Sequence, residues 1–157
     1  MDFFINNFNN EMAVFLLSMM PISELRGSIP LGISLGLSPL KSFAISLFGN
    51  IIIIPFLLLL FKPTIRFFAR TNLLKKPAAF IVKKIDQRAS KVIKYELIGL
   101  FLLVAIPLPT TGAWTGCGVA SLLKLDYKKS LIYISAGVIS AGLIVLLLSL
   151  IGLSLIK

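Results

Sequence analysis

The sequence predicts an all-α integral membrane protein made of two inverted repeats, and three observations lead to this prediction. Hydrophobic residues make up 57% of the 157-residue chain and charged residues only 14%, with a mean hydropathy of +0.98, which exceeds the values of soluble domains. The apolar residues form four long stretches, at 12–37, 42–61, 97–123 and 129–156. Prolines and glycines interrupt the first and the third stretch. We therefore expect one membrane domain over residues 1–157.

The stretches at 42–61 and 129–156 are long enough to cross a bilayer, since a span of ~30 Å needs about 20 helical residues. The apolar helix before each interruption, residues 12–20 or 97–106, would reach only about 14–15 Å. Each interrupted stretch is therefore expected to turn back as a re-entrant helical hairpin, and a broken helix that crosses fully is the alternative. The residues expected to break the backbone are Pro21, Gly27, Pro30, Pro107, Pro109 and Gly112.

Positive charge is concentrated in two segments. Residues 62–95 hold ten Lys or Arg and one acid, and residues 124–129 hold three Lys and one Asp. Because basic loops remain cytoplasmic, both segments are expected inside, with the N- and C-termini outside the plasma membrane. If all four stretches crossed, the two basic segments would lie on opposite faces, so the charge favours re-entry.

Residues 62–95 are expected to connect the repeats as a cytoplasmic segment. Pro63 and Pro77 punctuate it, and from Ala79 apolar residues recur at helical spacing opposite basic ones, which indicates an interfacial amphipathic helix. Its basic face would contact anionic membrane lipids. Nucleic-acid binding is the weaker interpretation, because a juxtamembrane segment already has an anionic surface beside it.

A register offset of 88 residues relates the two halves, repeat 1 at 12–61 and repeat 2 at 97–156. It superimposes Pro21 on Pro109, Lys41-Ser42 on Lys129-Ser130, and Gly49 on Gly137. Two such units joined by a single crossing have opposite orientations, as in many secondary transporters, whose sites lie at the midplane between broken helices.

Glu24 and Arg26 are the ionisable residues of the first break, and ionisable groups at membrane depth indicate a functional site. On extended backbone their i, i+2 spacing would place them on one face. Arg26 could then bind a phosphate or carboxylate, and Glu24 could exchange a proton. The alternative is that they neutralise each other to hold the turn, or lie in water at the interface.

The second break contributes hydroxyls and backbone. Thr110, Thr111 and Thr115 could satisfy freed carbonyls or line a cavity. A helix restarting near Thr111 or Gly112 would present N–H groups to an anion. Trp114 could cap that cavity, or serve as a packing or interfacial anchor. Asn50 lies near the middle of an apolar span, so it is expected to face the breaks, as a helix–helix hydrogen bond or as part of the site.

The chain has one cysteine and no histidine. Neither a Cys/His metal site nor a nucleophile paired with a base is indicated, so we expect no metal, no cofactor and no enzymatic activity.

The motifs at 21–32 and 105–116, with Gly49-Asn50 and Pro55, closely resemble the small multi-drug export protein family, a distant branch of the DedA or VTT-domain (SNARE-associated) superfamily. The resemblance covers nearly the whole chain. It implies two re-entrant hairpins, each followed by a transmembrane helix, and it implies transport, with Glu24 and Arg26 as the charged site residues. The second motif lacks the arginine that DedA relatives usually carry there.

The predicted function is a small membrane transporter or lipid translocator, coupled to protons or another ion and moving an amphipathic or anionic substrate. Two spans and two hairpins enclose little volume, so a homodimer is considered as well. The alternative is a non-transporting factor that organises lipids or assists assembly through its basic segment.

Overall fold

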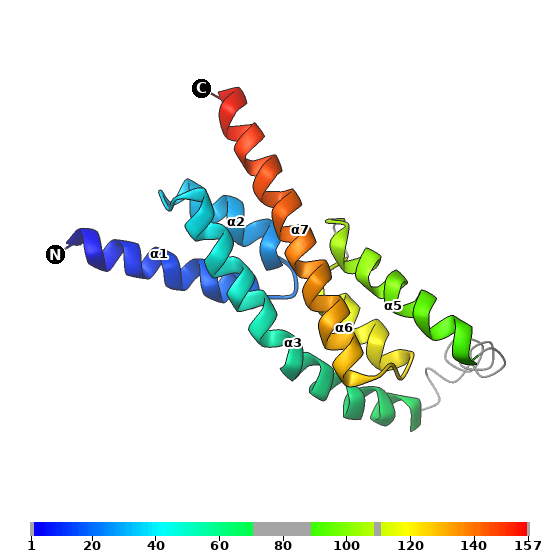
Figure 1. Ribbon diagram of the computed structural model, residues 1–157. Coiled ribbons are helices and arrows are strands. Elements are labelled where there is room, and N and C mark those ends of the chain that lie inside the picture. Colours follow the sequence, from blue (N-terminus) through cyan, green and yellow to red (C-terminus); the bar gives the residue numbers. More distant parts are fainter. Residues whose placement is uncertain (1, 71–88, 109–110, 157) are drawn as a thin grey trace.

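The computed structural model describes residues 2–70, 89–108 and 111–156, and every regular element within these ranges is a helix (Figure 1). The helices are, in order, α1 (Asp2–Met19), α2 (Glu24–Ser34), α3 (Pro39–Arg70), α5 (Ala89–Ala105), α6 (Ala113–Leu122) and α7 (Tyr127–Ile156).

The helices pack as two groups of three. Helices α1 and α2 pack on α3, and α5 and α6 pack on α7. Contacts of α3 with α6 and α7, and of α2 with α7, join the groups. In Figure 1, α1 and α5 lie on opposite sides of the long helices α3 and α7. Short turns therefore bring each small helix, α2 and α6, into the centre of the molecule.

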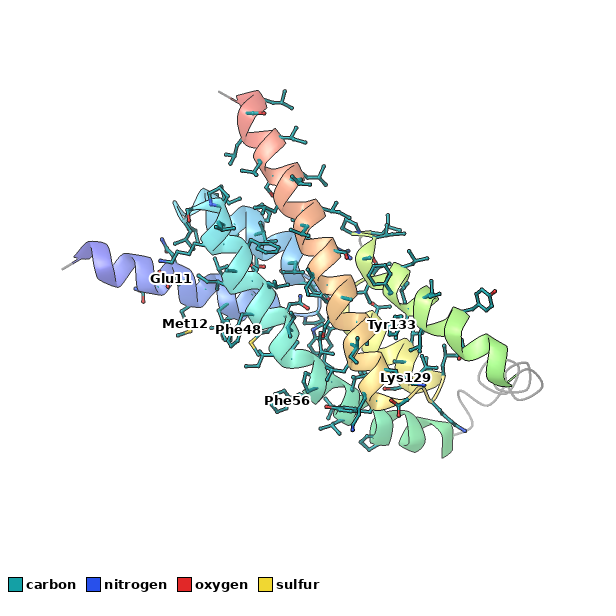
Figure 2. All side chains as sticks on the ribbon, in the orientation of Figure 1. Glu11, Met12, Phe48, Phe56, Lys129 and Tyr133 are labelled. Carbon is teal, nitrogen blue, oxygen red and sulfur yellow. The ribbon has the colours of Figure 1, made fainter. Side chains whose placement is uncertain are left out.

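Among the described residues, two helices are long and apolar enough to cross a membrane, Pro39–Phe61 within α3 and Tyr127–Leu155 within α7. They contain the predicted span at 42–61 and all but the last residue of the predicted span at 129–156. Large apolar side chains on them face outward. Phe48 and Phe56, labelled in Figure 2, are 63% and 67% exposed. Such a surface is suited to lipid rather than to water.

The helices that precede the two breaks are longer than the sequence suggested. Helix α1 begins at Asp2 and has 18 residues, and α5 begins at Ala89 and has 17. At 1.5 Å per residue, they extend about 27 and 26 Å. The expectation of about 14–15 Å was wrong because it counted only apolar residues, whereas the polar residues before them continue each helix.

The predicted connection at 62–95 is also shorter than expected. Residues 62–70 continue α3, with Pro63 inside the helix, and residues 89–95 belong to α5. A helix can accommodate such a proline at the loss of one backbone hydrogen bond. Pro77 and most of the predicted amphipathic helix lie outside the described residues.

The turns that follow α2 and α6 have the same backbone geometry. Gly36 and Lys124, which are 88 positions apart, have φ angles of 87° and 54°. The amide of Leu37 donates to the carbonyl of Gly32 at 3.0 Å, and the equivalent bond 88 residues later measures 2.9 Å. Both are the helix-terminating pattern that needs a left-handed residue.

Close helix contacts recur at the same offset. A Cβ atom at Gly49 would lie 2.9 Å from the carbonyl oxygen of Phe15, and one at Gly137 would lie 3.0 Å from that of Phe101. Glycine at these positions lets α3 approach α1 and α7 approach α5, as small residues do between membrane helices.

Candidate functional site

The two predicted breaks meet in the structure. The first lies between α1 and α2, at residues 20–23, and the second lies between α5 and α6, where the described residues are 106–108 and 111–112. Side chains from the first turn of α2 contact the start of α6. Residues about 90 positions apart in the sequence therefore form one site.

Glu24 caps the N-terminus of α6. Its side chain is 8% exposed, and its Oε1 atom accepts a hydrogen bond from the backbone N–H of Trp114 at 3.2 Å. The N–H of Ala113 also faces this carboxylate. The free N–H groups and the dipole at a helix N-terminus attract an anion. The predicted anion site at the start of α6 is thus filled by a carboxylate from the other half of the chain.

The backbone on both sides of this contact is unusual. Glu24 has a φ of 44°, and Gly112, the residue before α6, has a φ of 153°. The two positions are 88 residues apart, like Gly36 and Lys124. A Cβ atom built at Gly112 would overlap the carboxylate of Glu24. The missing side chain at residue 112 therefore leaves the space that Glu24 occupies, and the left-handed φ at Glu24 costs about 1–3 kcal/mol.

Arg26 binds the second break as well. Its Nη2 atom donates to Oγ1 of Thr111 at 2.9 Å and to the Thr111 carbonyl oxygen. The same hydroxyl donates to the Ile106 carbonyl at 2.7 Å and accepts from the N–H of Leu108 at 3.1 Å. Thr111 therefore closes its own turn and presents two oxygens to the guanidinium. This is the carbonyl-satisfying role that the sequence suggested for a threonine here.

The side chain of Trp114 adds a further bond between the halves. Its Nε1–H donates to the carbonyl of Met19, at the C-terminus of α1, at 3.0 Å. The indole also meets the Phe61 ring edge-on, with the ring centroids 6.4 Å apart. Trp114 thus caps a helix end rather than covering a cavity with its ring. Together the bonds of Glu24, Arg26 and Trp114 form a contact that we call the tip latch.

Asn50 lies beside this latch. It is 1% exposed, and its Nδ2 atom donates to the carbonyl of Ser18 at 3.2 Å. The predicted helix–helix hydrogen bond therefore joins α3 to the last turn of α1.

A small polar recess opens next to the latch. Its volume is about 40 Å³, and its lining consists of Pro21, Ile22, Ser23, Glu24, Arg26, Thr111 and Thr115. This is room for a few water molecules. Pockets that bind drug-sized ligands measure about 300–1,000 Å³, so this recess is too small for such a substrate.

Some predicted details were wrong. Gly27 and Pro30 lie inside α2 and do not break the backbone, whereas Pro21, Pro107 and Gly112 lie in the breaks. Pro30 is accommodated because the helix needs to forgo only one amide donor there. Arg26 is accordingly on helical backbone, and Glu24, the first residue of α2, has a left-handed φ and is not on extended backbone either.

The two side chains also do not bond to each other. The ion pair found among the described residues joins Glu11 to Lys41. Glu24 and Arg26 instead bind separate partners in the second half, while the charge of each still acts on the other. Pro109 and Thr110 lie outside the described residues.

Sequence reasoning missed two contributors to the site. Gly112 was assigned as a break but not as the position that makes room for the carboxylate, and Ser23 was not assigned. Thr115, which was expected to satisfy a carbonyl or line a cavity, is in the lining of the recess. The offset of 88 could have indicated Gly112, because it pairs this glycine with Glu24. In the ranges that the structure describes, no three Cys, Asp or Glu side chains come together as metal ligands.

The fold and the site define the class of protein. Two apolar helices of spanning length, an apolar outer surface and polar groups bonded between the two halves are features of a helical membrane protein. Residues 24–144 match the family described provisionally as small multi-drug export proteins, and the chain belongs to that family. Searches of the curated proteins and of the solved structures found no match.

Proposed function

We propose that this chain is a small secondary transporter that exchanges protons for an amphipathic substrate, with Glu24 as the proton-binding group. The observation that carries the proposal is the position of the Glu24 carboxylate, buried at the N-terminus of α6 in the opposite half. Family membership supports export as the activity class.

The transporter plan rests on two inverted repeats, α1–α3 and α5–α7. Four described residues have a positive φ, and they form two pairs that are 88 positions apart. Helix α3 packs on α6, and α7 packs on α2. These two contacts correspond, because α3 of the first repeat matches α7 of the second and α2 matches α6. In this proposal α1–α2 and α5–α6 are re-entrant hairpins of opposite orientation, as in the DedA superfamily, and residues 124–129 face the cytoplasm.

The tip latch would be the gate between the repeats. While Glu24 is ionised, its charge attracts the positive end of α6 and holds the halves together. A proton on Glu24 removes that attraction, and the bond from the N–H of Trp114 to the carboxylate loses its charge assistance. The halves could then separate, which would free Arg26 from Thr111 to meet a charged head group.

The size of the recess fits a closed state. About 40 Å³ cannot hold an amphipathic substrate, so transport requires the repeats to move apart. No covalent step is needed for this cycle, and we accordingly propose a transporter and not an enzyme.

Reconstitution into liposomes tests the proposal. A pH gradient should drive movement of ethidium, an amphipathic cation, or of a fluorescent phosphatidylglycerol, an anionic lipid. Glu24→Gln should reduce movement of the active probe by about a hundredfold, since it removes the proton-binding group. Glu96→Gln, on α5 and outside the latch, should retain wild-type transport.

The outcomes separate the candidate functions. Transport by Glu24→Gln at the wild-type rate would exclude Glu24 as the coupling group. If the wild-type chain moves neither probe faster than protein-free vesicles do, transport of these substrate classes is excluded. Loss of function only on neutralising the basic residues of 62–95 would instead indicate the lipid-organising alternative.

A further inference from the structure

A row of buried polar side chains runs along one face of α3. Ser42, Ser46 and Asn50 are one helical turn apart and at most 1% exposed. Within the described part of the chain, Ser42 Oγ, Ser46 Oγ and Asn50 Oδ1 make no hydrogen bond. Three buried polar oxygens without a partner on one face are unusual, because each loses its hydration without compensation. We call these three residues the α3 polar file.

Helix packing alone does not require the α3 polar file. The offset of 88 residues places Ser130, Ile134 and Val138 of α7 at the equivalent positions. Ile134 and Val138 are buried and belong to the apolar core. The second repeat therefore fills the positions of Ser46 and Asn50 with aliphatic side chains. A need for close helix approach would explain a small residue such as Ser42. It would not explain Asn50, because the equivalent position of α7 holds Val138.

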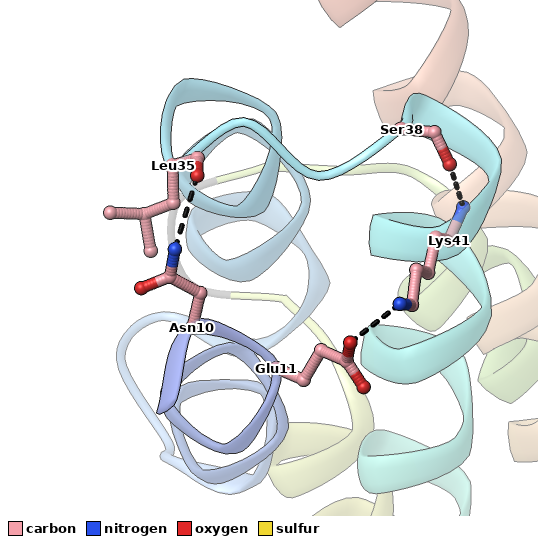
Figure 3. Close-up of polar contacts among 5 residues, drawn as sticks. All are labelled: Asn10, Glu11, Leu35, Ser38 and Lys41. Atoms are coloured by element: carbon pink, nitrogen blue, oxygen red, sulfur yellow. Dashed lines mark hydrogen bonds and ion pairs between the residues drawn. The ribbon is translucent and has the colours of Figure 1, made fainter. Parts of the chain in front are cut away.

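One end of the file, Ser42, directly follows Lys41, which belongs to the polar cluster shown in Figure 3. Lys41, directly before Ser42, forms an ion pair with Glu11 of α1 at 2.5 Å. Next to it, Asn10 donates to the carbonyl of Leu35 at 3.1 Å. This cluster joins α1 to the α2–α3 turn, where water can reach it, since the side chains of Lys41 and Glu11 are 50% and 31% exposed.

The other end of the file reaches the tip latch. Asn50 donates to the carbonyl of Ser18. The neighbouring carbonyl of Met19 accepts from the indole N–H of Trp114, and the backbone N–H of Trp114 donates to the carboxylate of Glu24. Helix α2 lies along the file as well, because a Cβ atom at Gly32 would touch Ser42. One turn from Glu24, the buried hydroxyl of Ser28 donates to the Glu24 carbonyl.

We infer that the α3 polar file conducts protons from the surface at Glu11 and Lys41 to the carboxylate of Glu24 when the repeats separate and water enters between its side chains, which are dry in the closed state. This inference rests on the proposed function and adds a route, and its side of entry, to it. The Cβ atoms of residues one turn apart on a helix are separated by about 5–6 Å, which is a distance that one water can bridge.

Each transfer along the file conserves protons. A hydronium ion at the surface gives a proton to the first oxygen, each hydroxyl or water accepts one proton and releases another to the next, and the last proton binds the Glu24 carboxylate. Asn50 positions the relay without carrying a proton, because its Nδ2 is held by Ser18 and its Oδ1 can accept a hydrogen bond from water. Arg26 and the thiol of Cys117 are the titratable groups near Glu24 in the described residues.

The test uses two matched double variants of the full chain. Ser42→Ala with Ser46→Ala removes the hydroxyls of the file, and Ser121→Ala with Ser130→Ala removes two buried hydroxyls of the second repeat that also lack partners. Proton uptake is measured with an internal pH dye in liposomes under a potassium diffusion potential. Ethidium and lipid movement are measured in the same preparations, and melting in detergent checks folding.

We expect the first double variant to lower proton uptake about tenfold or more and the second to retain the wild-type rate. Equal uptake by both variants, whether unchanged or equally reduced, would overturn the inference. Probe transport by the wild-type chain without proton uptake would overturn both this route and the proton exchange of the proposed function, whereas proton-coupled probe transport that the first double variant retains would overturn the route alone. Absence of probe movement by the wild-type chain would count against the proposed function instead.

Discussion

Replacing Gly112 by alanine should disrupt the tip latch from the side of the second repeat. The residue has φ 153° and ψ −166°, a region that only glycine adopts readily. A Cβ atom there would also overlap the carboxylate of Glu24. Gly112→Ala therefore imposes two separate costs, backbone strain and displacement of the carboxylate from α6.

The expected size of each cost follows from the geometry. The backbone strain is about 1–3 kcal/mol. Displacing the carboxylate loses its hydrogen bond with the N–H of Trp114, and a bond to a charged group contributes about 1.5–3 kcal/mol. Gly112→Ala should thus lower the free energy of unfolding by about 3–5 kcal/mol. In a Glu24→Ala background the carboxylate is already absent, so the same substitution should cost only about 1–3 kcal/mol.

A double-mutant cycle measures the difference. Unfolding by a denaturing detergent in mixed micelles can be followed by the fluorescence of Trp114, the single tryptophan of the chain. Gly118→Ala is the matched control on α6, because nothing lies within 4 Å of a Cβ atom at Gly118. It should stabilise the helix by about 0.5–1 kcal/mol. A coupling between positions 24 and 112 below about 0.5 kcal/mol would refute the proposed contact.

Two further predictions address the latch and the topology. Trp114→Phe removes the bond to the Met19 carbonyl and should lower the free energy of unfolding by about 1–3 kcal/mol. Circular dichroism during the same detergent titration measures this change. An unchanged free energy of unfolding would show that this bond does not hold the halves together. In a Cys117→Ala background, a membrane-impermeant thiol reagent should label Ile22→Cys from outside and Leu108→Cys from the cytoplasm, since these residues are 93% and 54% exposed at the two breaks. Labelling of both from one side would contradict opposed re-entrant hairpins.

The sequence predicted the long helices well because length and hydropathy are local properties. Both apolar spans and both interruptions are found in the structure. The boundaries were less predictable. Polar residues before each apolar stretch continue α1 and α5, and Pro30 and Pro63 lie within helices. Hydropathy reports where lipid can lie and not where a helix ends, and a proline stops a helix only when the surrounding packing favours the stop.

The site was predicted in part for a similar reason. The sequence motifs identified Glu24 and Arg26 as ionisable groups at membrane depth, Thr111 as a residue that could satisfy a freed carbonyl, and the start of α6 as a place for an anion. The pairing of Glu24 with that anion site depends on how two distant turns dock, which local patterns do not report. The i, i+2 argument was wrong because the first turn of α2 is helical, and its two charged side chains reach different parts of the second break.

The offset of 88 residues explains why the two breaks carry unequal chemistry. The same position of the repeat holds Glu24 in one half and Gly112 in the other, and both residues have a positive φ. If both positions held an acid, two buried carboxylates would compete for the same space and would repel each other. If both held glycine, the N-terminus of α6 would lack its buried anion. A contact between these two turns is therefore complementary only when one turn carries the charge and the other provides the room, and the two proposed repeats must differ at the point where they meet.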